Sequence, residues 1–201
     1  MHWNTQLFLS LNAPVHPGGA ALFAAEALAA GPVFLAPVLL ACLWVWGPPD
    51  RRPALIAVAA GLFVGQGLNV LLGVVWYEPR PFAAGVGHTW LAHAADNGFP
   101  SDHATLAWSL GLGLVLTGAS RRWGAAACLL GVAAGWARVY LGVHFPVDVL
   151  TSAPVGLLAG TVACLAVPAV EAHLSPRAER LYEAVLGRLP AGLPLPRRGD
   201  L

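Results

Sequence analysis

Long apolar segments dominate the chain and alternate with short segments that carry most of its polar residues. Five apolar segments can be drawn, at residues 18–47, 54–77, 104–119, 123–143 and 147–170. Because a helix needs about 20 residues to cross roughly 30 Å of hydrocarbon, this pattern predicts five transmembrane helices. The third crosses only if it begins near residue 101. The first is long and contains Pro32 and Pro37, so a broken pair, and hence six segments, stays an alternative.

A further short helix is predicted before the first apolar segment. Within residues 2–12, Trp3, Leu7, Phe8 and Leu11 stand at helical spacing among polar residues. This pattern predicts an N-terminal helix that lies in the membrane interface. The alternative is that these residues form the irregular start of the first span.

The C-terminal residues differ from the rest because they are rich in proline and arginine. We expect an amphipathic interfacial helix at about 175–188, followed by a loose end. The chain is therefore divided into one membrane domain, 1–170, and a cytoplasmic tail, 171–201.

The composition agrees with an all-α membrane bundle and excludes several other classes. Hydrophobic residues make up 57% of the chain, charged residues only 10%, and the mean hydropathy is +0.66. Soluble domains carry about 25% charged residues. A net charge of +1 offers no basic surface for nucleic acid. Cys42, Cys128 and Cys164 lie in apolar segments without metal-ligand spacing, so we expect neither a zinc site nor a disulfide framework.

The arginines, which are the only cationic residues besides histidine, predict the orientation. Arginine pairs at 51–52 and 121–122 separate the first segment from the second and the third from the fourth, and five more arginines follow the fifth. With five spans these regions share one face, which the positive-inside rule makes cytoplasmic. The loops at 78–103 and 144–147 then lie on the outer face.

Three segments with polar side chains, 76–82, 98–105 and 136–148, converge on that outer face. Ionisable groups at a membrane boundary are costly unless they have a function. The candidate functional residues are Arg80, Ser101, Asp102, His103, Arg138, His144 and Asp148.

The residue types in this cluster suit the chemistry of phosphate. Two guanidinium groups can each donate paired hydrogen bonds to phosphoryl oxygens. Pro100-Ser101 is typical of a helix start, and the amides of Asp102 and His103 would then face outward as an anion site. No Asp/Glu cluster of a metal-binding type accompanies them.

Two histidines can divide the work of a displacement reaction, one attacking and the other protonating the leaving oxygen. His144 is followed four residues later by Asp148, a spacing that places both side chains on one helix face. Such a carboxylate can select the tautomer of the imidazole and stabilise the cation that forms.

These segments resemble the three signature motifs of the type 2 phosphatidic acid phosphatase superfamily of membrane lipid phosphatases. The first motif ends in Arg80-Pro81, the second is 100-PSDH-103, and the third is Arg138-x5-His144-x3-Asp148. The resemblance covers residues 54–170. The runs HTWLAHAADNGFPSDHAT and RVYLGVHFPVDVL further resemble the small bacterial undecaprenyl-diphosphate phosphatases of this superfamily.

The resemblance implies a hydrolase that removes the terminal phosphate of undecaprenyl diphosphate outside the bacterial cytoplasmic membrane, with no metal or other cofactor. His144 would form a phosphohistidine, His103 would act as general acid, and Asp148 would orient His144. The phosphoryl oxygens would be bound by Arg80, Ser101, Asp102 and Arg138. The expected partners are the polyprenyl phosphate substrate and the surrounding lipids.

The chain departs from the family pattern at two positions. Gly73 stands where the family has lysine, and Ala137 stands where it has serine. Asn69 shares a helix face with Gly73, so it either reaches the phosphate or makes an ordinary interhelical hydrogen bond. His88 and His93, in the loop over the site, are candidates for contact with the second phosphate.

Three other functions remain open at this stage. The same chemistry could act on another lipid phosphate, such as phosphatidylglycerophosphate or phosphatidate. The phosphohistidine could pass its phosphoryl group to a lipid rather than to water. A non-catalytic lipid carrier or binder is the third alternative, and the glycine at the position of the family lysine is its only support.

Overall fold

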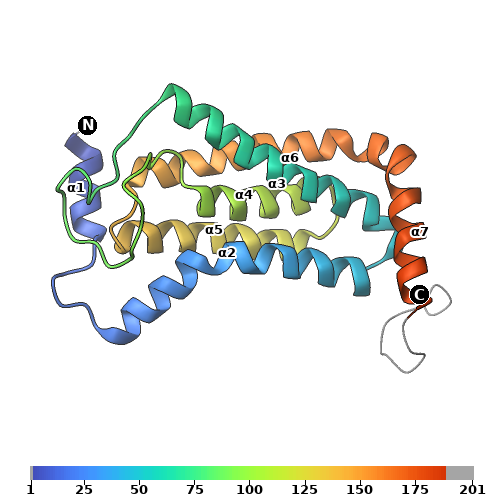
Figure 1. Ribbon diagram of the computed structural model, residues 1–201, viewed down its shortest axis with the longest axis horizontal. Coiled ribbons are helices and arrows are strands. Elements are labelled where there is room, and N and C mark those ends of the chain that lie inside the picture. The colour runs from blue at the N-terminus through green and yellow to red at the C-terminus, as the bar shows by residue number, and fades with distance from the viewer. Residues whose placement is uncertain (1, 189–201) are drawn as a thin grey trace.

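The computed structural model describes residues 2–188 and shows an all-helical bundle (Figure 1). Its helices, in chain order, are α1 (His2–Leu11), α2 (Gly19–Trp46), the 3-10 turn η1 (Pro49–Arg51), α3 (Arg52–Val75), α4 (Asp102–Leu116), α5 (Arg121–Tyr140), α6 (Pro146–His173) and α7 (Ser175–Leu186). Each predicted apolar segment forms one helix. The predicted N-terminal helix and the predicted helix of the C-terminal tail are also present. Residues 189–201, the end of the predicted tail, lie outside the described residues.

The first apolar segment forms one continuous helix and not a broken pair. Pro32 and Pro37 both lie inside α2, which continues through them to Trp46. Membrane helices tolerate proline where neighbouring groups satisfy the freed backbone. Six separate segments are therefore not formed.

Within residues 2–188, three helical segments are long and apolar enough to cross a membrane by length and composition: Gly19–Trp46, Pro49–Val75 and Pro146–His173. Helix α4 has 15 residues, which corresponds to about 22 Å and is shorter than the hydrocarbon core. Helix α5 has 20 residues but carries arginines at both ends. Both helices nevertheless pack among the three long ones, so five spans stay a prediction.

Helix α4 lies at the centre of the bundle, where it packs against α6, α5, α3 and α2 (Figure 1). Small residues make this close packing possible. A Cβ atom added to Gly156 would lie 2.5 Å from the Cβ atom of Trp108, and one added to Gly111 would lie 2.5 Å from Sγ of Cys128. Only glycine therefore permits these helix approaches, as is usual where lipid offers no hydrophobic drive for association.

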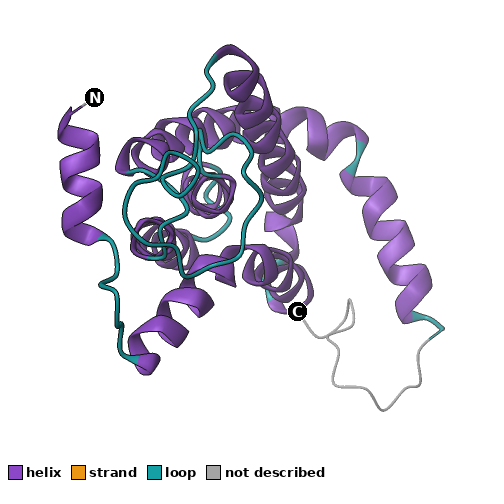
Figure 2. Ribbon diagram, turned by 60° about the vertical axis from the view of Figure 1, so that its left-hand side comes forward, coloured by secondary structure: helices purple, strands orange, loops and turns teal. Residues whose placement is uncertain are grey.

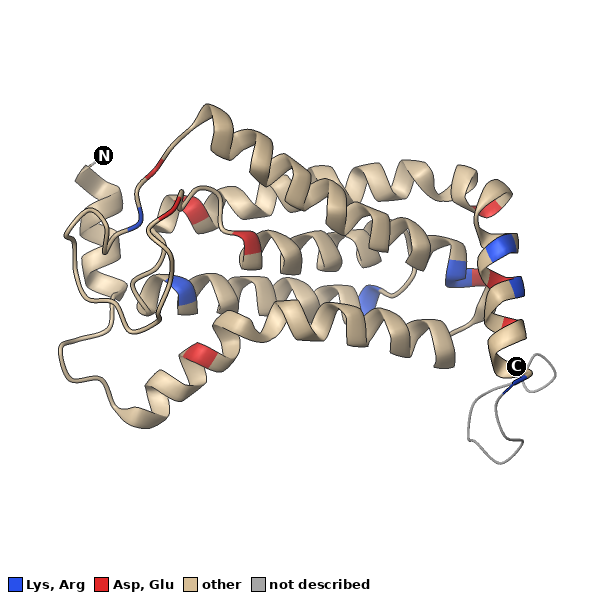
Figure 3. Cartoon of the chain, viewed as in Figure 1, with Lys and Arg blue, Asp and Glu red and all other residues tan. Residues whose placement is uncertain are grey.

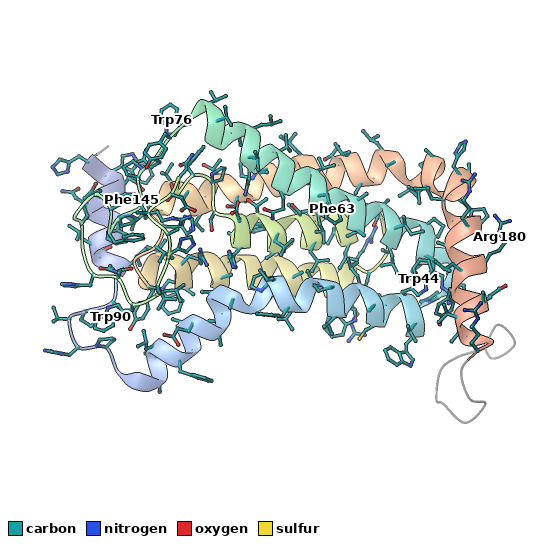
Figure 4. The ribbon with its side chains drawn as sticks, viewed as in Figure 1. Trp44, Phe63, Trp76, Trp90, Phe145 and Arg180 are labelled. Carbon is teal, nitrogen blue, oxygen red and sulfur yellow. The ribbon has the colours of Figure 1, made fainter. Side chains whose placement is uncertain are left out.

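Helix α1 lies across one end of the bundle and is held by protein contacts. Phe8 is fully buried, and its ring meets that of Phe145 edge-on with the centroids 5.2 Å apart. Asn4 accepts a hydrogen bond from the Val147 amide at 3.0 Å. Figure 4 shows Phe145 and Trp90 at this same end, far from Trp44. The α1 helix thus braces the connection between α5 and α6; its place in the membrane interface stays a prediction.

Helix α7 covers the opposite end of the bundle. The guanidinium group of the buried Arg52 lies 5.3 Å from the ring centroid of Trp44 and 4.8 Å from that of Tyr182. Arg52 also donates a hydrogen bond to the Trp44 carbonyl and approaches Glu179 at 3.8 Å. Cation–π contacts of this kind join α7 to α2 and α3.

The long loop between α3 and α4 lies over the end of the bundle that α1 braces (Figure 2). Asn12 ties this loop down, since its amide donates to the carbonyls of His88 and Tyr140 and its oxygen accepts from the His88 amide. Gly142 has a φ of +80°, and a Cβ atom there would collide with the His88 carbonyl. The turn after α5 therefore needs glycine for the loop to approach.

Candidate functional site

The three sequence motifs meet beneath this loop, as predicted. Arg80 comes from the loop, Arg138 from the last turn of α5, and His144 from the short connection between α5 and α6. Their exposed fractions are 4%, 3% and 1%. Asp148, in the first turn of α6, is fully buried. Segments far apart in the sequence thus form one enclosed polar cluster.

The environment of His144 determines which ring nitrogen can attack. Its Nε2 atom lies 3.0 Å from a terminal nitrogen of Arg80 and 3.3 Å from one of Arg138. Guanidinium groups only donate hydrogen bonds, so Nε2 must be the unprotonated nitrogen and the proton belongs on Nδ1. The lone pair of Nε2 is therefore directed at the place where two cationic groups would bind an anion.

Asp148 faces the other side of the imidazole. Its Oδ2 atom lies 3.5 Å from Nδ1 of His144 and accepts a 2.8 Å hydrogen bond from the Phe145 amide. One carboxylate oxygen therefore accepts from the backbone at the start of α6 and faces the imidazole without a hydrogen bond to it. The spacing of four residues achieves this because Pro146 opens the helix directly after the histidine connection.

Arg80 is held by contacts from three directions. Nε donates to Asp96 at 2.7 Å, NH1 donates to the Val143 carbonyl at 3.0 Å, and NH2 donates to the Asn97 carbonyl at 3.2 Å. Sequence reasoning missed Asp96 and Asn97 as partners. The only signal was two adjacent polar residues just before the second motif. Arg80 thus arrives at His144 already oriented.

Asn97 organises the loop around the position where the family has lysine. Its side-chain oxygen accepts from the amides of Glu78 and Phe99, and its amide donates to the carbonyls of Gly73 and Trp76. A Cβ atom on Gly73 would lie 3.1 Å from Nδ2 of Asn97. The glycine therefore leaves the space in which Asn97 joins the end of α3 to the loop.

The start of α4 contributes Ser101, the N-cap residue. The predicted side-chain cap is absent, because Ser101 makes no capping hydrogen bond with its hydroxyl group. Its amide donates instead to the carbonyl of Asp148 at 3.1 Å, and Ser152 donates to the Ser101 carbonyl at 3.0 Å. These bonds join the starts of α4 and α6, and they leave the buried Ser101 hydroxyl without a protein partner.

The side chain of Asp102 is bonded to α3. Its carboxylate accepts a 2.9 Å hydrogen bond from Asn69, whose oxygen accepts a 3.1 Å bond from Thr105. Asn69 therefore makes the interhelical contact between α3 and α4, and the structure does not bring it to His144. The backbone amide of Asp102 lies in the first turn of α4, where helix amides have no intrahelical acceptor, so it stays a candidate anion ligand.

His103 and the loop histidines take different places. His103 lies in the first turn of α4, partly buried and within electrostatic reach of Arg138, and its Nδ1 atom has no partner. His88 is exposed and contacts Asn12 through its backbone, so the structure does not place its side chain at the site. The side chain of His93 lies nearer the cluster, because its Nδ1 atom is 3.8 Å from the carboxylate of Asp96, the partner of Arg80.

Charge in this cluster shifts the protonation of groups outside the helices. Burial, followed by the charges of Arg138 and Arg80, lowers the pKa of His144 well below its ordinary value. Burial and Arg80 likewise lower the pKa of His93. For Asp96, burial opposes ionisation, but the hydrogen bond and charge of Arg80 outweigh it and lower the pKa. The imidazole of His144 is therefore neutral, as a nucleophile must be.

Buried polar atoms without partners gather in this cluster. Within residues 2–188 they include the Ser101 hydroxyl, Nδ1 of His103, Nε of Arg138, Nδ1 of His144 and Oδ1 of Asp148. Buried polar groups are normally satisfied, so a concentration of unsatisfied ones indicates a ligand site. The described part of the chain contains no group of three or more His, Cys, Asp or Glu side chains placed to hold a metal ion.

Comparison with known proteins agrees with this geometry. The family model of the PAP2 superfamily matches residues 54–171. The chain is 36% identical over 163 residues to the Escherichia coli (strain K12) protein named "Putative undecaprenyl-diphosphatase YbjG", covering 81% of this chain and 79% of that protein. It is 32% identical over 156 residues to "Undecaprenyl-diphosphatase BcrC" of Bacillus subtilis (strain 168), covering 76% and 77%.

A solved structure shows the same fold. The crystal structure of Aquifex aeolicus LpxE matches with a TM-score of 0.63 at 24% identity, covering 80% of this chain and 94% of that chain. The family match spans more than half of the sequence, and the relatives are similar over most of their length. The chain therefore belongs to the PAP2 superfamily and is a membrane lipid-phosphate phosphatase.

Proposed function

We propose that this enzyme hydrolyses undecaprenyl diphosphate to undecaprenyl phosphate and inorganic phosphate through a phosphohistidine. The observation that carries this proposal is the position of Nε2 of His144, which faces guanidinium groups of Arg80 and Arg138. The names of the two relatives support a diphosphate substrate. The unsatisfied polar atoms around the imidazole support a phosphoryl group as the ligand.

In the first step, Nε2 of His144 attacks the terminal phosphorus while the bond to the bridging oxygen breaks. His103 gives its proton to that oxygen, and undecaprenyl phosphate leaves. The two arginines exchange their contact with Nε2 for the phosphoryl oxygens, whose charge they stabilise as the bonds rearrange. The Ser101 hydroxyl and the first amides of α4 are the further donors.

In the second step, water attacks the phosphohistidine, His103 accepts a proton from that water, and inorganic phosphate is released. His144 is then neutral again and ready for another cycle. While the phosphohistidine exists, its ring carries positive charge, which the buried carboxylate of Asp148 stabilises at 3.5 Å. Two guanidinium groups supply the positive charge that a metal would otherwise provide, so the proposed reaction requires no cofactor.

The site is proposed to open on the outer face of the bacterial cytoplasmic membrane. The loop-covered cluster lies at the opposite end of the bundle from Arg51, Arg52, Arg121 and Arg122, as Figure 3 allows the reader to follow. Positively charged loops favour the cytoplasmic side. The distribution of arginines therefore supports outward-facing chemistry and a cytoplasmic position for α7.

The first experiment measures phosphate release by the purified protein in detergent, with undecaprenyl diphosphate as substrate and EDTA present. Native protein should release phosphate, and His144→Ala should not. An acid-labile, alkali-stable phosphoryl group should be trapped on native protein after rapid quenching, and it should form more slowly in His103→Ala, because the leaving oxygen then lacks its proton donor. Release without any trapped intermediate, or full release by His144→Ala, would overturn the mechanism.

The same assay separates the alternatives that share this site. Phosphatidylglycerophosphate and phosphatidate, compared at equal concentration, should give a lower kcat/KM than undecaprenyl diphosphate if the proposed substrate is correct. If an added acceptor lipid does not lower the amount of inorganic phosphate released, the result argues against phosphotransfer. Absence of release from all of these lipid phosphates would favour a carrier.

A further inference from the structure

A partly open cavity lies at the end of the bundle away from His144. It encloses about 430 Å³ between the end of α2, the turn η1 and the start of α5. Arg51, Ser120 and Arg122 form its polar wall. None of these residues takes part in the proposed reaction. A basic, partly enclosed cavity at this level of a membrane bundle suits the headgroup of an anionic lipid.

An apolar groove of about 640 Å³ adjoins this cavity, and the two share Leu43, Gly47, Trp123 and Ala126 in their walls. The groove follows α2 back to Leu35. Twelve residues separate Leu35 from Gly47, which corresponds to about 18 Å of helix. One leaflet of a bilayer contributes about 15 Å of hydrocarbon, so the groove has the length of an acyl chain.

The two arginines have donors available for a phosphate group. Arg51 uses one terminal nitrogen to donate to the Ala119 carbonyl at 3.2 Å, which fixes its side chain at the cavity wall. Arg122 is exposed, and within the described residues no acceptor is found for its side chain. Trp46 and Trp123 are 59% and 53% exposed beside them. Tryptophan at this position is typical of the membrane interface, where lipid phosphates lie.

We propose that the cavity and groove bind one anionic phospholipid, with its phosphate between Arg51 and Arg122 and an acyl chain along α2 and α5. The site is separate from the catalytic cluster. Sixteen residues of α5 separate Arg122 from Arg138, which corresponds to about 24 Å. A headgroup held by Arg122 therefore cannot reach His144, and the bound lipid is a structural partner from the leaflet on the arginine-rich face.

The test uses the full chain in detergent, mixed with phosphatidylglycerol, with phosphatidylcholine of identical acyl chains, or with undecaprenyl phosphate. Native mass spectrometry counts the lipid retained. Phosphatidylglycerol should be retained in preference to phosphatidylcholine. The double variant Arg51→Gln, Arg122→Gln should lower that preference at least tenfold, because charge-assisted hydrogen bonds are lost.

A matched control removes two arginines from the same face, Arg177→Gln with Arg180→Gln in α7, and should keep the preference. Leu39→Trp, which fills the groove, should reduce retention of phosphatidylglycerol even if the arginine variant fails to fold. Equal retention of both phospholipids by native protein, or equal loss in the two arginine pairs, would overturn the proposal. So would selective retention of undecaprenyl phosphate alone, which would assign the groove to the substrate's tail.

Discussion

Replacing Asp148 by asparagine separates the charge of this residue from its place in the fold. A single oxygen, Oδ2, accepts from the Phe145 amide at 2.8 Å and faces Nδ1 of His144 at 3.5 Å. The other oxygen, Oδ1, has no partner. An asparagine can place its carbonyl oxygen where Oδ2 was and its amide where Oδ1 was. Asp148→Asn is therefore expected to keep the tautomer of His144 and to remove only the negative charge.

The free energy lost with that charge can be calculated from the distance between Oδ2 of Asp148 and Nδ1 of His144. Two unit charges 3.5 Å apart interact by about 5 kcal/mol at an effective dielectric constant of about 20. The cation exists on His144 only once phosphoryl transfer has begun, so the loss falls on the transition state and the phosphohistidine. At about 1.4 kcal/mol for each factor of ten, kcat should fall on the order of 10³-fold with little change in KM.

Phosphate release from undecaprenyl diphosphate provides the assay, with thermal unfolding as the check on folding. Asp148→Ala should lose stability as well as activity, because the buried Phe145 amide then lacks its acceptor at a cost of about 1–3 kcal/mol. Asp50→Asn, an equal charge change in η1, is the control and should retain activity. If Asp148→Asn stays folded and within tenfold of native kcat, the carboxylate only caps α6 and the reasoning is wrong.

Three further results are expected. Gly73→Lys should lower kcat/KM rather than improve it, because the new Cβ presses on Asn97 at 3.1 Å, and Gly73→Ala should change it in the same direction. Arg52→Gln should lower the free energy of unfolding by about 2 kcal/mol through the lost cation–π contacts, measured by chemical denaturation. The lowered pKa of His93 favours its neutral form in the folded loop. As pH falls below 6.5 and through the folded pKa, the protection factors of the amides at residues 88–97, corrected for the intrinsic pH dependence of hydrogen exchange, should therefore fall; unchanged protection factors would contradict this.

The parts of the site that could be predicted are those fixed by short-range geometry. His144 and Asp148 are four residues apart, but His144 lies before α6 and not on a shared helix face as expected, because α6 begins only at Pro146. Their proximity therefore follows from the short sequence separation. Arg138 lies six residues before the histidine, within the last turn of α5. These positions follow from spacing along one stretch of chain, and the structure confirms them.

The contacts that sequence reasoning missed depend on the path of the long loop. Asp96 meets Arg80 from sixteen residues away, and Asn12 meets His88 from seventy-six residues away. No periodicity marks such pairs, since neither partner lies on a helix face. Asn69 is a different case. A polar side chain on an apolar helix indicates a hydrogen bond, but the sequence does not identify the partners. The packing of α3 on α4 shows that they are Asp102 and Thr105.

Gly73 has one meaning in the sequence and another in the structure. The sequence alone indicates that Gly73 removes a phosphate ligand, because no other residue nearby replaces the positive charge of the family's lysine. In the structure, the space beside it is filled by the amide of Asn97, which donates to the Gly73 carbonyl and whose own carbonyl accepts from Arg80. Asn97 supplies no charge, so it does not replace the lysine as a phosphate ligand. It holds Arg80 against His144 instead, and a lysine built at 73 would have to displace the asparagine on which that position depends.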